Sequence, residues 1–358
     1  MSVGSPSTDL SVSTQIDGLI DLVALRAWLD DQGVSPGRPL EVVGLLGGGT
    51  QNILLRLRRG SRDLVLRRGP RHLRTSTNDN LRREMRVLDG LSRTRVPHAR
   101  LVADCPDEDI LGGAAFYVME LVDGLNPTVE MPWAEEDVTR TRRLCFSTVE
   151  ALAGLGEVDH EAVGLSGVGR PDGFLERQVA RWRSELATYA RFPEYQGPDL
   201  PAVAAIGDWL DDNRPADWTP GILHGDFHLA NLLVDPSTAE VAAIVDWEMA
   251  TIGDPLLDLG SLLATWPRPG RPHGVGWSVD SMASAVTKPE LVQHYADRSH
   301  RDMSAIDWYE VLASWKLAIV IEGTHARACA GLAPRDTGKM LHAWAVTLLD
   351  QARVVAGV

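Results

Sequence analysis

The sequence predicts an α+β protein with two lobes, a small N-terminal lobe built on an antiparallel sheet and a larger, mostly helical C-terminal lobe. Residues 52–57 and 63–68 are β-prone runs separated by Arg-Gly-Ser, a spacing typical of a hairpin. A second pair of β-prone runs occupies residues 100–104 and 115–121, and long segments with helical periodicity follow Gly124. The chain of 358 residues is long enough to form the two hydrophobic cores that such a protein requires.

The N-terminal lobe is expected to span residues 15–122, after a flexible tail of small and polar residues at positions 1–14. Apolar residues at helical spacing predict a helix over residues 16–32, which is followed by a glycine where a helix commonly ends. Residues 71–80 are polar and are expected to form a flexible connection to the next helix.

The C-terminal lobe is expected to span residues 123–358 and to consist mainly of helices. A compact section of strands and turns at residues 221–250 interrupts these helices, and a loop rich in proline and glycine is predicted at residues 266–281. The predicted helices cover residues 135–155, 173–189, 202–212, 255–264, 289–299, 306–330 and 339–355.

Composition and charge exclude several classes of protein. The net charge of −14, without a basic stripe, argues against a nucleic-acid-binding protein. No apolar run reaches about 18 residues, so no membrane span is expected, and the first residues lack the basic start and apolar run of a signal peptide. Cys105, Cys145 and Cys329 lie far apart, which indicates reduced thiols and a cytoplasmic protein. No heptad or symmetric patch indicates an oligomeric state, which stays open.

The strongest functional motif is HGDFHLAN at residues 224–231. An aspartate followed five positions later by an asparagine, on a turn before a β-prone run, is what kinase-type phosphoryl transfer requires. Asp226 can accept or orient the proton of an attacking hydroxyl group, and Asn231 can offer its amide oxygen to Mg²⁺. Either residue alone would more commonly form an Asx turn.

A second motif, VDWE at residues 245–248, places a carboxylate at the end of an apolar strand. Asp246 lies one hairpin downstream of Asp226, where it can bind the Mg²⁺ that bridges the β- and γ-phosphates of a nucleotide. An aspartate in such a position is, in isolation, usually a cap or a solvated strand end. The two motifs at this spacing together predict a kinase that uses ATP and Mg²⁺.

The segments HGDFHLANLLVD and AIVDWEMATIGDPLLDLG resemble the catalytic and metal-binding segments of the aminoglycoside phosphotransferase and choline kinase superfamily. The most similar branch is the phosphotransferase-like domain associated with acyl-CoA dehydrogenases. Because this superfamily is similar in fold to protein kinases, the resemblance implies a bilobal, protein-kinase-like fold. It also implies that Asp226 is the catalytic base and that Asn231 and Asp246 are the Mg²⁺ ligands.

The resemblance assigns roles to other residues of these segments. His228 stands where protein kinases usually carry a lysine near the γ-phosphate, although a loop histidine without phosphate contact is an equal alternative. His224 is expected to brace the catalytic loop. Asp254 and Asp258 are expected to be structural, and Asp254 is placed to cap a helix because Pro255 follows it.

One helical stripe in the C-terminal lobe has two interpretations. Trp308, Trp315 and Glu322 repeat every seven residues and therefore share one face of a predicted helix. Packing in the core is the default expectation for such a stripe, and a wall of a substrate pocket is the alternative.

The N-terminal lobe is expected to bind the nucleotide. The turn GLLGGGTQN at residues 44–52 precedes a strand, where backbone N–H groups can approach phosphates. Its pattern is neither GxGxxG nor a Walker A loop. It resembles the glycine turn of this branch. The strand at residues 63–68 carries an arginine where a kinase has its phosphate-binding lysine, and arginine can hold phosphates in a bidentate manner. Its expected partner is a glutamate on the following helix, and a surface pair is the alternative. Residues 116–124 resemble the hinge whose backbone pairs with adenine. The expected nucleotide-binding residues are Gly48, Gly49, Thr50, Asn52, Arg67, Glu84, Met119, Glu120 and Val122.

The predicted function is transfer of the γ-phosphate of ATP to a hydroxyl group of a small molecule. The alternatives are a catalytically silent ATP-binding regulator of kinase shape and a protein kinase, which is disfavoured by HGD in place of HRD and by the lack of an APE segment. The acceptor stays open among aminoglycosides, amino alcohols, sugars and hydroxyacyl compounds.

Overall fold

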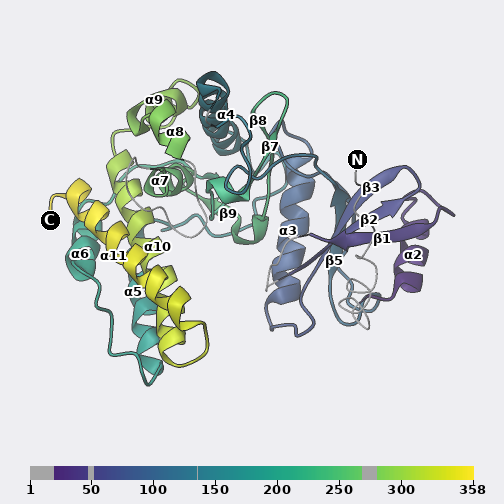
Figure 1. Cartoon of the computed structure of the whole chain (residues 1–358), viewed down its shortest axis with the longest axis horizontal. Helices are drawn as coiled ribbons and strands as arrows, with labels where there is room; N and C mark the ends of the chain where they lie inside the picture. Colours follow the sequence, from purple (N-terminus) through teal and green to yellow (C-terminus); the bar gives the residue numbers. More distant parts are fainter. Residues whose placement is uncertain (1–19, 47–51, 135, 268–279) are drawn as a thin grey trace. The chain divides into compact units, whose positions relative to one another are not determined.

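The computed structural model describes residues 20–46, 52–134, 136–267 and 280–358 (Figure 1). The chain divides into two compact units, Met1–Asp123 and Gly124–Val358. The first unit contains a five-stranded sheet, and the second is mostly helical with two small sheets. The predicted α+β class is therefore confirmed.

The sheet of the first unit is antiparallel at every pairing and has the order β1-β2-β3-β5-β4. The central hairpin of β2 and β3 is in full register along its length, which places Leu54 opposite Arg67. The strands are β1 (Leu40–Leu45), β2 (Ile53–Arg59), β3 (Arg62–Arg68), β4 (Leu101–Cys105) and β5 (Phe116–Glu120).

Two helices cover the two faces of this sheet. Leu66 of β3 belongs to a buried hydrophobic cluster that also includes residues of α2 (Leu22–Asp31). Because side chains alternate along a strand, Arg67 points to the opposite face. There it meets Glu84 of α3 (Thr77–Leu91). The alternation along β3 thus places the buried Arg67 against α3.

The second unit contains two short strand pairs surrounded by helices. The strand β6 (Gly221–Leu223) pairs with β9 (Thr251–Gly253), and β7 (Leu232–Asp235) pairs with β8 (Glu240–Ile244). Its helices are α4 (Val138–Gly156), α5 (Glu176–Thr188), α6 (Val203–Asp212), α7 (Leu256–Ala264), α8 (Asp280–Ala285), α9 (Lys288–Ala296), α10 (Ile306–Cys329) and α11 (Arg335–Ala356), with short 3₁₀ turns η1 (Tyr189–Arg191), η2 (Leu229–Asn231) and η3 (Trp247–Met249).

Helix α10 packs against α5, α6, α7 and α11 in the second unit. Trp308 and Trp315 on α10 are almost completely buried, and their indole N–H groups donate to backbone carbonyls of α6 at 2.9 and 2.8 Å. The two tryptophans of the predicted stripe therefore pack in the core. Gly260 of α7 lies so close to α10 that a Cβ added there would come within 2.5 Å of the Tyr309 carbonyl oxygen.

The predicted strand pairs and long helices agree with the structure to within a few residues at their ends, with two corrections at helix starts. Helix α2 begins at Leu22 and not near residue 16, because the Asp21 carboxylate caps it by accepting from the N–H groups of Val23 and Ala24 at 2.9 and 3.0 Å. The expected tail at residues 1–14 lies outside the described residues, as do residues 268–279 of the expected loop.

The prediction of a flexible stretch over residues 71–80 is wrong for its end, because α3 already begins at Thr77. The side chain of Asn78 donates to the Gly113 carbonyl at 2.9 Å and accepts from the Ala115 N–H at 3.1 Å. These tertiary contacts anchor the first turn of the helix, and they are invisible in local composition. Neither the edge strand β1 nor the short helix α8 was expected.

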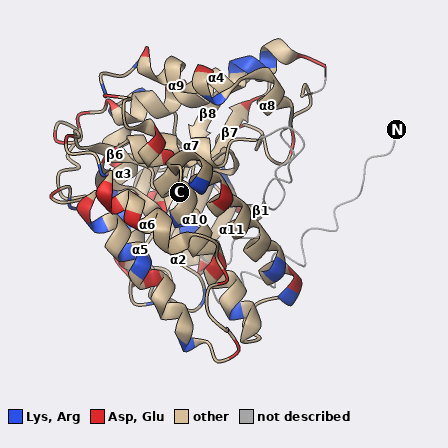
Figure 2. Cartoon of the chain, turned by 90° about the vertical axis from the view of Figure 1, so that its left-hand side faces the viewer, with Lys and Arg blue, Asp and Glu red and all other residues tan. Residues whose placement is uncertain are grey.

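Charged residues of both signs are interspersed along α5 and α11, whereas the charged residues of α6 are all aspartates (Figure 2). Over these helices they do not gather into a basic stripe. Within the ranges that the structure describes, no helix combines the length and apolar character needed to cross a membrane.

Candidate active site

The loop at residues 224–231 is built around a buried histidine. The His224 side chain is fully buried, its Nε2 donates to the Val245 carbonyl at 2.9 Å, and its Nδ1 accepts from the Asp226 backbone N–H at 3.3 Å. Burial lowers the pKa of His224, which favours the neutral ring that this pattern of one donor and one acceptor requires. His224 therefore links the two segments that contain Asp226 and Asp246, as its expected bracing role requires.

A second brace comes from α7. The Asp258 carboxylate is buried and accepts from the backbone N–H groups of His224 and Gly225 at 2.6 and 2.9 Å. Burial raises the pKa of Asp258 to about 7, against the effect of these two hydrogen bonds. Gly225 has a φ of +84°, and a Cβ there would lie 2.5 Å from the Met249 carbonyl oxygen. Only glycine fits this turn, which presents the next residue, Asp226.

Asp226 stands at the centre of a group of polar side chains. Its side chain is 53% exposed, and its Oδ2 lies 3.4 Å from His228 Nε2 and 3.3 Å from Asn231 Nδ2. Asn231 Nδ2 also donates to the Asp226 carbonyl oxygen at 2.9 Å. Burial opposes ionisation of Asp226, but the hydrogen bond with His228 and the positive charges around it lower its pKa to about 2. The carboxylate is therefore ionised at neutral pH.

Lys316 is a residue of this group that sequence reasoning missed. It lies on α10, its Nζ donates to the Gly225 carbonyl at 3.1 Å, and it lies 5.5 Å from the centre of the Trp182 ring. Burial lowers the pKa of Lys316, while the charges of Asp226 and Asp258 oppose that shift. The available signal was a single cation in the apolar run ASWKLAIVI, where a charge needs a partner.

Asp246 follows β8 in a left-handed conformation, with φ 69° and ψ 63°. This region is unfavourable for a residue with a Cβ, and such strain is common at functional sites. The chain is held on both sides of the strained residue. Val245 donates its N–H to the Asn231 carbonyl at 2.9 Å, and the buried Trp247 donates its indole N–H to Ile244 at 3.0 Å. The strand end that carries Asp246 is thus tied to the loop that carries Asn231.

The first unit brings together a different pair of predicted residues. Arg67 and Glu84 are 6% and 1% exposed, so the alternative of a surface pair is wrong. Arg67 Nε lies 2.9 Å from Glu84 Oε2, and Arg67 Nη2 donates to Oε1 at 3.2 Å. The Tyr117 hydroxyl also donates to Glu84 Oε2 at 2.8 Å, a contact that the sequence did not suggest. The glutamate thereby holds the guanidinium in a fixed orientation.

The remaining predicted nucleotide-binding residues have less defined surroundings. Gly48, Gly49 and Thr50 lie outside the described residues, and Asn52 is a partly exposed residue just before β2. Met119 and Glu120 end β5 and Val122 follows it; the Glu120 N–H donates to the Arg100 carbonyl at 2.9 Å.

The sequence profile described as the phosphotransferase enzyme family matches residues 42–309, which is most of the chain. The chain belongs to the phosphotransferase enzyme family. Among solved structures, this phosphotransferase resembles a Ralstonia eutropha protein provisionally named an aminoglycoside phosphotransferase. The two share 27% identity with a TM-score of 0.77, over 93% of this chain and 98% of that one. The structure of an aminoglycoside phosphotransferase in complex with ADP and hygromycin B shares the fold, at 15% identity and a TM-score of 0.59 over 92% of this chain and 97% of that one. The predicted kinase-like fold is confirmed.

Curated relatives of this phosphotransferase are longer proteins. Acyl-CoA dehydrogenase family member 11 from Gallus gallus is 29% identical over 84% of this chain, and the match covers 39% of that protein. The protein of the same name from Homo sapiens is 29% identical over 79% of this chain and 36% of its own length. The chain thus spans about two fifths of the length of these relatives, and the resemblance to a branch associated with acyl-CoA dehydrogenases is confirmed.

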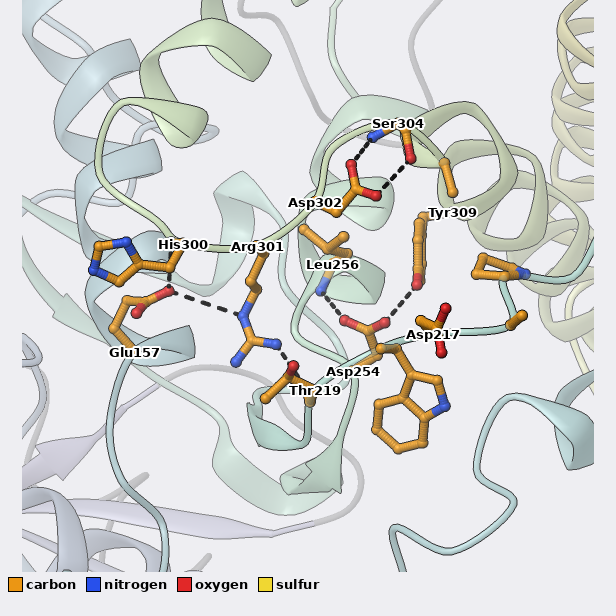
Figure 3. Close-up of a pocket in the computed structure, with 14 residues that line it drawn as sticks. Glu157, Asp217, Thr219, Asp254, Leu256, His300, Arg301, Asp302, Ser304 and Tyr309 are labelled. Atoms are coloured by element: carbon orange, nitrogen blue, oxygen red, sulfur yellow. Dashed lines mark hydrogen bonds and ion pairs between the residues drawn. The ribbon is translucent and has the colours of Figure 1, made fainter.

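A separate cavity of about 480 Å³ lies in the second unit of this phosphotransferase (Figure 3). Asp254 lines it, and the Asp254 carboxylate accepts from the Tyr309 hydroxyl and from the Leu256 N–H at 3.1 Å. Arg301 in the same wall donates to the carbonyls of Thr219 and Gly156 at 2.5 and 2.7 Å. These contacts support a structural role for Asp254, and none of the predicted site residues within the described ranges lines the cavity.

Proposed function

We propose that this phosphotransferase is an ATP-dependent kinase that transfers the γ-phosphate to a hydroxyl group of a small molecule. The observation that carries the proposal is the group around Asp226, an ionised and half-exposed carboxylate that faces Asn231 and His228 on a loop braced by His224 and Asp258. Because the surrounding residues already hold this carboxylate in place, it can orient a hydroxyl group without first having to become ordered itself.

Asp226 is the residue that handles the acceptor proton. The acceptor oxygen attacks the γ-phosphorus, the bond from that phosphorus to the bridging oxygen of ADP breaks, and the hydroxyl proton leaves towards Asp226. Because the pKa of Asp226 is about 2, it is a weak base that mainly orients the hydroxyl until the new bond is well advanced. His228, 3.4 Å from the same carboxylate oxygen, is placed to donate to a transferred phosphate oxygen.

Asn231 and Asp246 fit a magnesium ion. Their side chains offer oxygen ligands, which Mg²⁺ prefers. The Nδ2 of Asn231 faces Asp226, so its amide oxygen points away from that carboxylate and can serve as a ligand. When bound, Mg²⁺ would neutralise the charge that develops on the β- and γ-phosphates. Asp246 and Asn231 orient it because their two segments are tied by the hydrogen bond between Val245 and Asn231.

The first unit supplies the nucleotide contacts in this proposal. Arg67, held by Glu84, would bind the α- and β-phosphates, and the turn with Gly48, Gly49, Thr50 and Asn52 would cover them. Adenine would lie against Met119, with its edge paired to the backbone of Glu120 and Val122. Since the Glu120 N–H already donates to the Arg100 carbonyl, Glu120 would contact the adenine edge through its carbonyl oxygen.

The acceptor that we favour is a hydroxyacyl compound. The curated relatives that match most of this chain bear names of acyl-CoA dehydrogenases, and they are 27–29% identical to it. The structures complexed with hygromycin B or kanamycin are 15% identical and support the fold alone. An aminoglycoside acceptor is the competing possibility, because a protein with a net charge of −14 would attract a cationic substrate.

The test is a panel of acceptors incubated with ATP, Mg²⁺ and purified protein, with ADP release and product mass as the measurements. Asp226→Asn is the inactive variant, expected to lower kcat by about 10²–10⁴-fold. Asp235→Asn is the matched control, because Asp235 ends β7 in the same section and, among the described residues, its side chain accepts hydrogen bonds only from the neighbouring Ser237 and Thr238. Acceptor-dependent ADP release from hydroxyacyl thioesters that is lost only in Asp226→Asn supports the proposal.

Two other outcomes have definite meanings. Efficient phosphorylation of aminoglycosides and not of hydroxyacyl compounds would keep the kinase and replace the acceptor. Binding of ATP without turnover on any small acceptor would favour the silent regulator and overturn the kinase.

A further inference from the structure

A cluster of metal-binding side chains lies where α10 and α11 meet, away from the residues assigned to phosphate transfer. Glu322 and His325 on α10 and His342 on α11 each offer a ligand atom, and these atoms all lie within 4.8 Å of one another. Glu322 and His325 are three residues apart, so they share one face of α10. Three ligands from two helices are thus gathered in one place.

Close contact between the helices brings His342 to this place. A Cβ added at Gly338 of α11 would lie 2.4 Å from the Ala328 Cβ and 3.6 Å from His325 Nδ1. The absence of a side chain at Gly338 therefore lets the two helices approach closely beside His325. One helical turn further along α11, His342 reaches Glu322.

The cluster is chemically unusual for a helix interface. Glu322 is fully buried, and its carboxylate accepts from the Tyr195 hydroxyl and from His342 Nδ1, both at 2.8 Å. The rings of His325 and His342 lie side by side with their centres 4.6 Å apart. Among the residues that the structure describes, the buried Nδ1 atom of His325 has no hydrogen-bond partner. A buried polar atom of this kind requires an explanation, and a metal ligand is one.

We propose that Glu322, His325 and His342 form a binding site for a divalent transition-metal ion, with Zn²⁺ as the best-matched ion. Two imidazoles and one carboxylate are a common three-ligand set for zinc, with a further position open to water. Bonds of about 2.0–2.2 Å place neighbouring ligand atoms about 3.3 Å apart in a tetrahedral site. The Glu322 Oε2–His342 Nδ1 distance is 2.8 Å, and all ligand atoms of the cluster lie within 4.8 Å of one another. Since these two distances bracket the value for a tetrahedral site, rotation of the side chains is enough to bring the ligand atoms to that spacing.

The surroundings of the cluster complete the site. The Tyr195 hydroxyl holds the second oxygen of Glu322 and so orients the ligand, as partners outside a metal's own ligands commonly do. Cys329 Sγ lies 3.7 Å from His325 Nε2 and adds a soft donor nearby. Imidazole and thiol groups favour zinc over magnesium, so this site would not compete for the ion assigned to Asn231 and Asp246.

The site would join α10 to α11 and would not take part in phosphate transfer. Glu322 lies six residues beyond Lys316, the α10 residue that contacts the catalytic loop, which corresponds to about 9 Å along a helix. The readouts are therefore metal binding and thermal stability, and neither depends on whether the kinase proposal holds.

The experiment titrates Zn²⁺ into EDTA-treated and dialysed full-length protein by calorimetry, in excess Mg²⁺. His342→Gln is the main variant, because His342 is partly exposed and a glutamine amide can still donate to Glu322. His325→Gln is the second, and His72→Gln, at an exposed position of the first unit, is the matched control. Titration with Co²⁺, followed by its visible absorption, reports the coordination geometry.

The wild type and His72→Gln are expected to bind one Zn²⁺ and to melt at a higher temperature with it. Both cluster variants are expected to bind at least 10–100-fold more weakly and to lose the zinc-dependent rise in Tm. Equal Zn²⁺ affinity in the wild type and in both cluster variants would overturn the proposal, as would no binding by the folded wild type.

Discussion

The ammonium group of Lys316 contacts the backbone of the catalytic loop and interacts with the carboxylates of Asp226 and Asp258. It donates to the Gly225 carbonyl at 3.1 Å, and its charge acts on both Asp226 and Asp258. We infer that Lys316 positions the loop and stabilises the ionised form of Asp226, and that it does not contact the transferred phosphate.

Replacing Lys316 with methionine keeps the length of the side chain and removes the charge and the hydrogen bond. A hydrogen bond from a charged group contributes about 1.5–3 kcal/mol, so we expect kcat to fall by about 10–100-fold. The KM for ATP should change little. Steady-state kinetics measure both, with Lys339→Met at an exposed site of α11 as the control. An unchanged kcat would remove Lys316 from the site.

Asp258 makes stability depend on pH in a defined direction. Burial raises the pKa of the folded-state carboxyl to about 7, above the ordinary value of 3.8 in the unfolded chain. The folded protein therefore holds this proton more tightly, and the stabilisation that results is complete below pH 4 and is lost as the pH rises through 7.

Urea denaturation of the wild type and of Asp258→Asn from pH 4 to pH 8 tests this direction. The free energy of unfolding of the wild type should fall relative to the variant as the pH rises, by at most about 4 kcal/mol. Any offset from the loss of an acceptor does not vary with pH, so only the slope is diagnostic. A difference that is constant or increases with pH would contradict the prediction.

The site residues differ in how far the sequence could predict them. Asp226, Asn231 and Asp246 are assigned to the site from the sequence, because their chemistry depends on residue type at short spacing within one section of chain; the structure brings Asp226 next to Asn231, and the roles of all three stay predictions. Lys316 and Tyr117 were not, because each reaches its partner from a helix or strand far away in the sequence. The pairing of Arg67 with Glu84 was expected only through the family resemblance, since nothing local indicates that both are buried.

At the scale of elements, α7 and α10 pack without room for a side chain at Gly260. A Cβ there would lie 2.5 Å from the Tyr309 carbonyl oxygen, which is backbone and cannot rotate away. We expect Gly260→Ala to lower the free energy of unfolding by about 1–3 kcal/mol, because the helices must separate.

The matched control is Gly154→Ala in α4, where nothing lies within 4 Å of the added Cβ. This variant should be more stable than the wild type by about 0.5–1 kcal/mol, because alanine is the better helix former. Chemical denaturation measures the free energy of unfolding of both variants and therefore the sign of each change. Similar effects of the two substitutions would show that the contact with Tyr309 is not tight.

The elements that were predicted well are those whose pattern is local. The hairpin of β2 and β3 has its turn residues and strands in one continuous segment, and α10 is one uninterrupted segment of 24 residues without proline. Strand β1 was missed because its only signal is pairing with β2, and the start of α3 was missed because Asn78 is held by the distant residues Gly113 and Ala115. Contacts between distant residues decided both cases.

At the scale of the whole molecule, a nucleotide that binds the folded protein must stabilise it. At a concentration of about 100 times Kd, such a ligand adds about 2.7 kcal/mol to the free energy of unfolding. We therefore expect a non-hydrolysable ATP analogue with Mg²⁺ to raise Tm by roughly 3–4 °C for a chain of 358 residues.

The Asp246→Asn variant distinguishes the contribution of Mg²⁺ to the rise in Tm from the contribution of the nucleotide. The variant should retain a smaller rise with the analogue and lose the additional rise that Mg²⁺ produces, whereas Asp235→Asn should behave as the wild type. Thermal melting with and without Mg²⁺ is sufficient. A full magnesium effect in Asp246→Asn would show that the ion binds elsewhere.

The left-handed backbone of Asp246 decides how its function is best removed. Alanine at φ 69° would keep the Cβ of Asp246 but lose the short polar side chain that lets aspartate and asparagine adopt this region, so an inactive alanine variant would combine the loss of the carboxylate with added backbone strain. Glycine adopts this conformation without strain, and asparagine tolerates it. Asparagine keeps the Cβ and nearly the size of the aspartate, so an Asp246→Asn enzyme that folds as the wild type and fails to turn over would report the loss of the carboxylate charge alone.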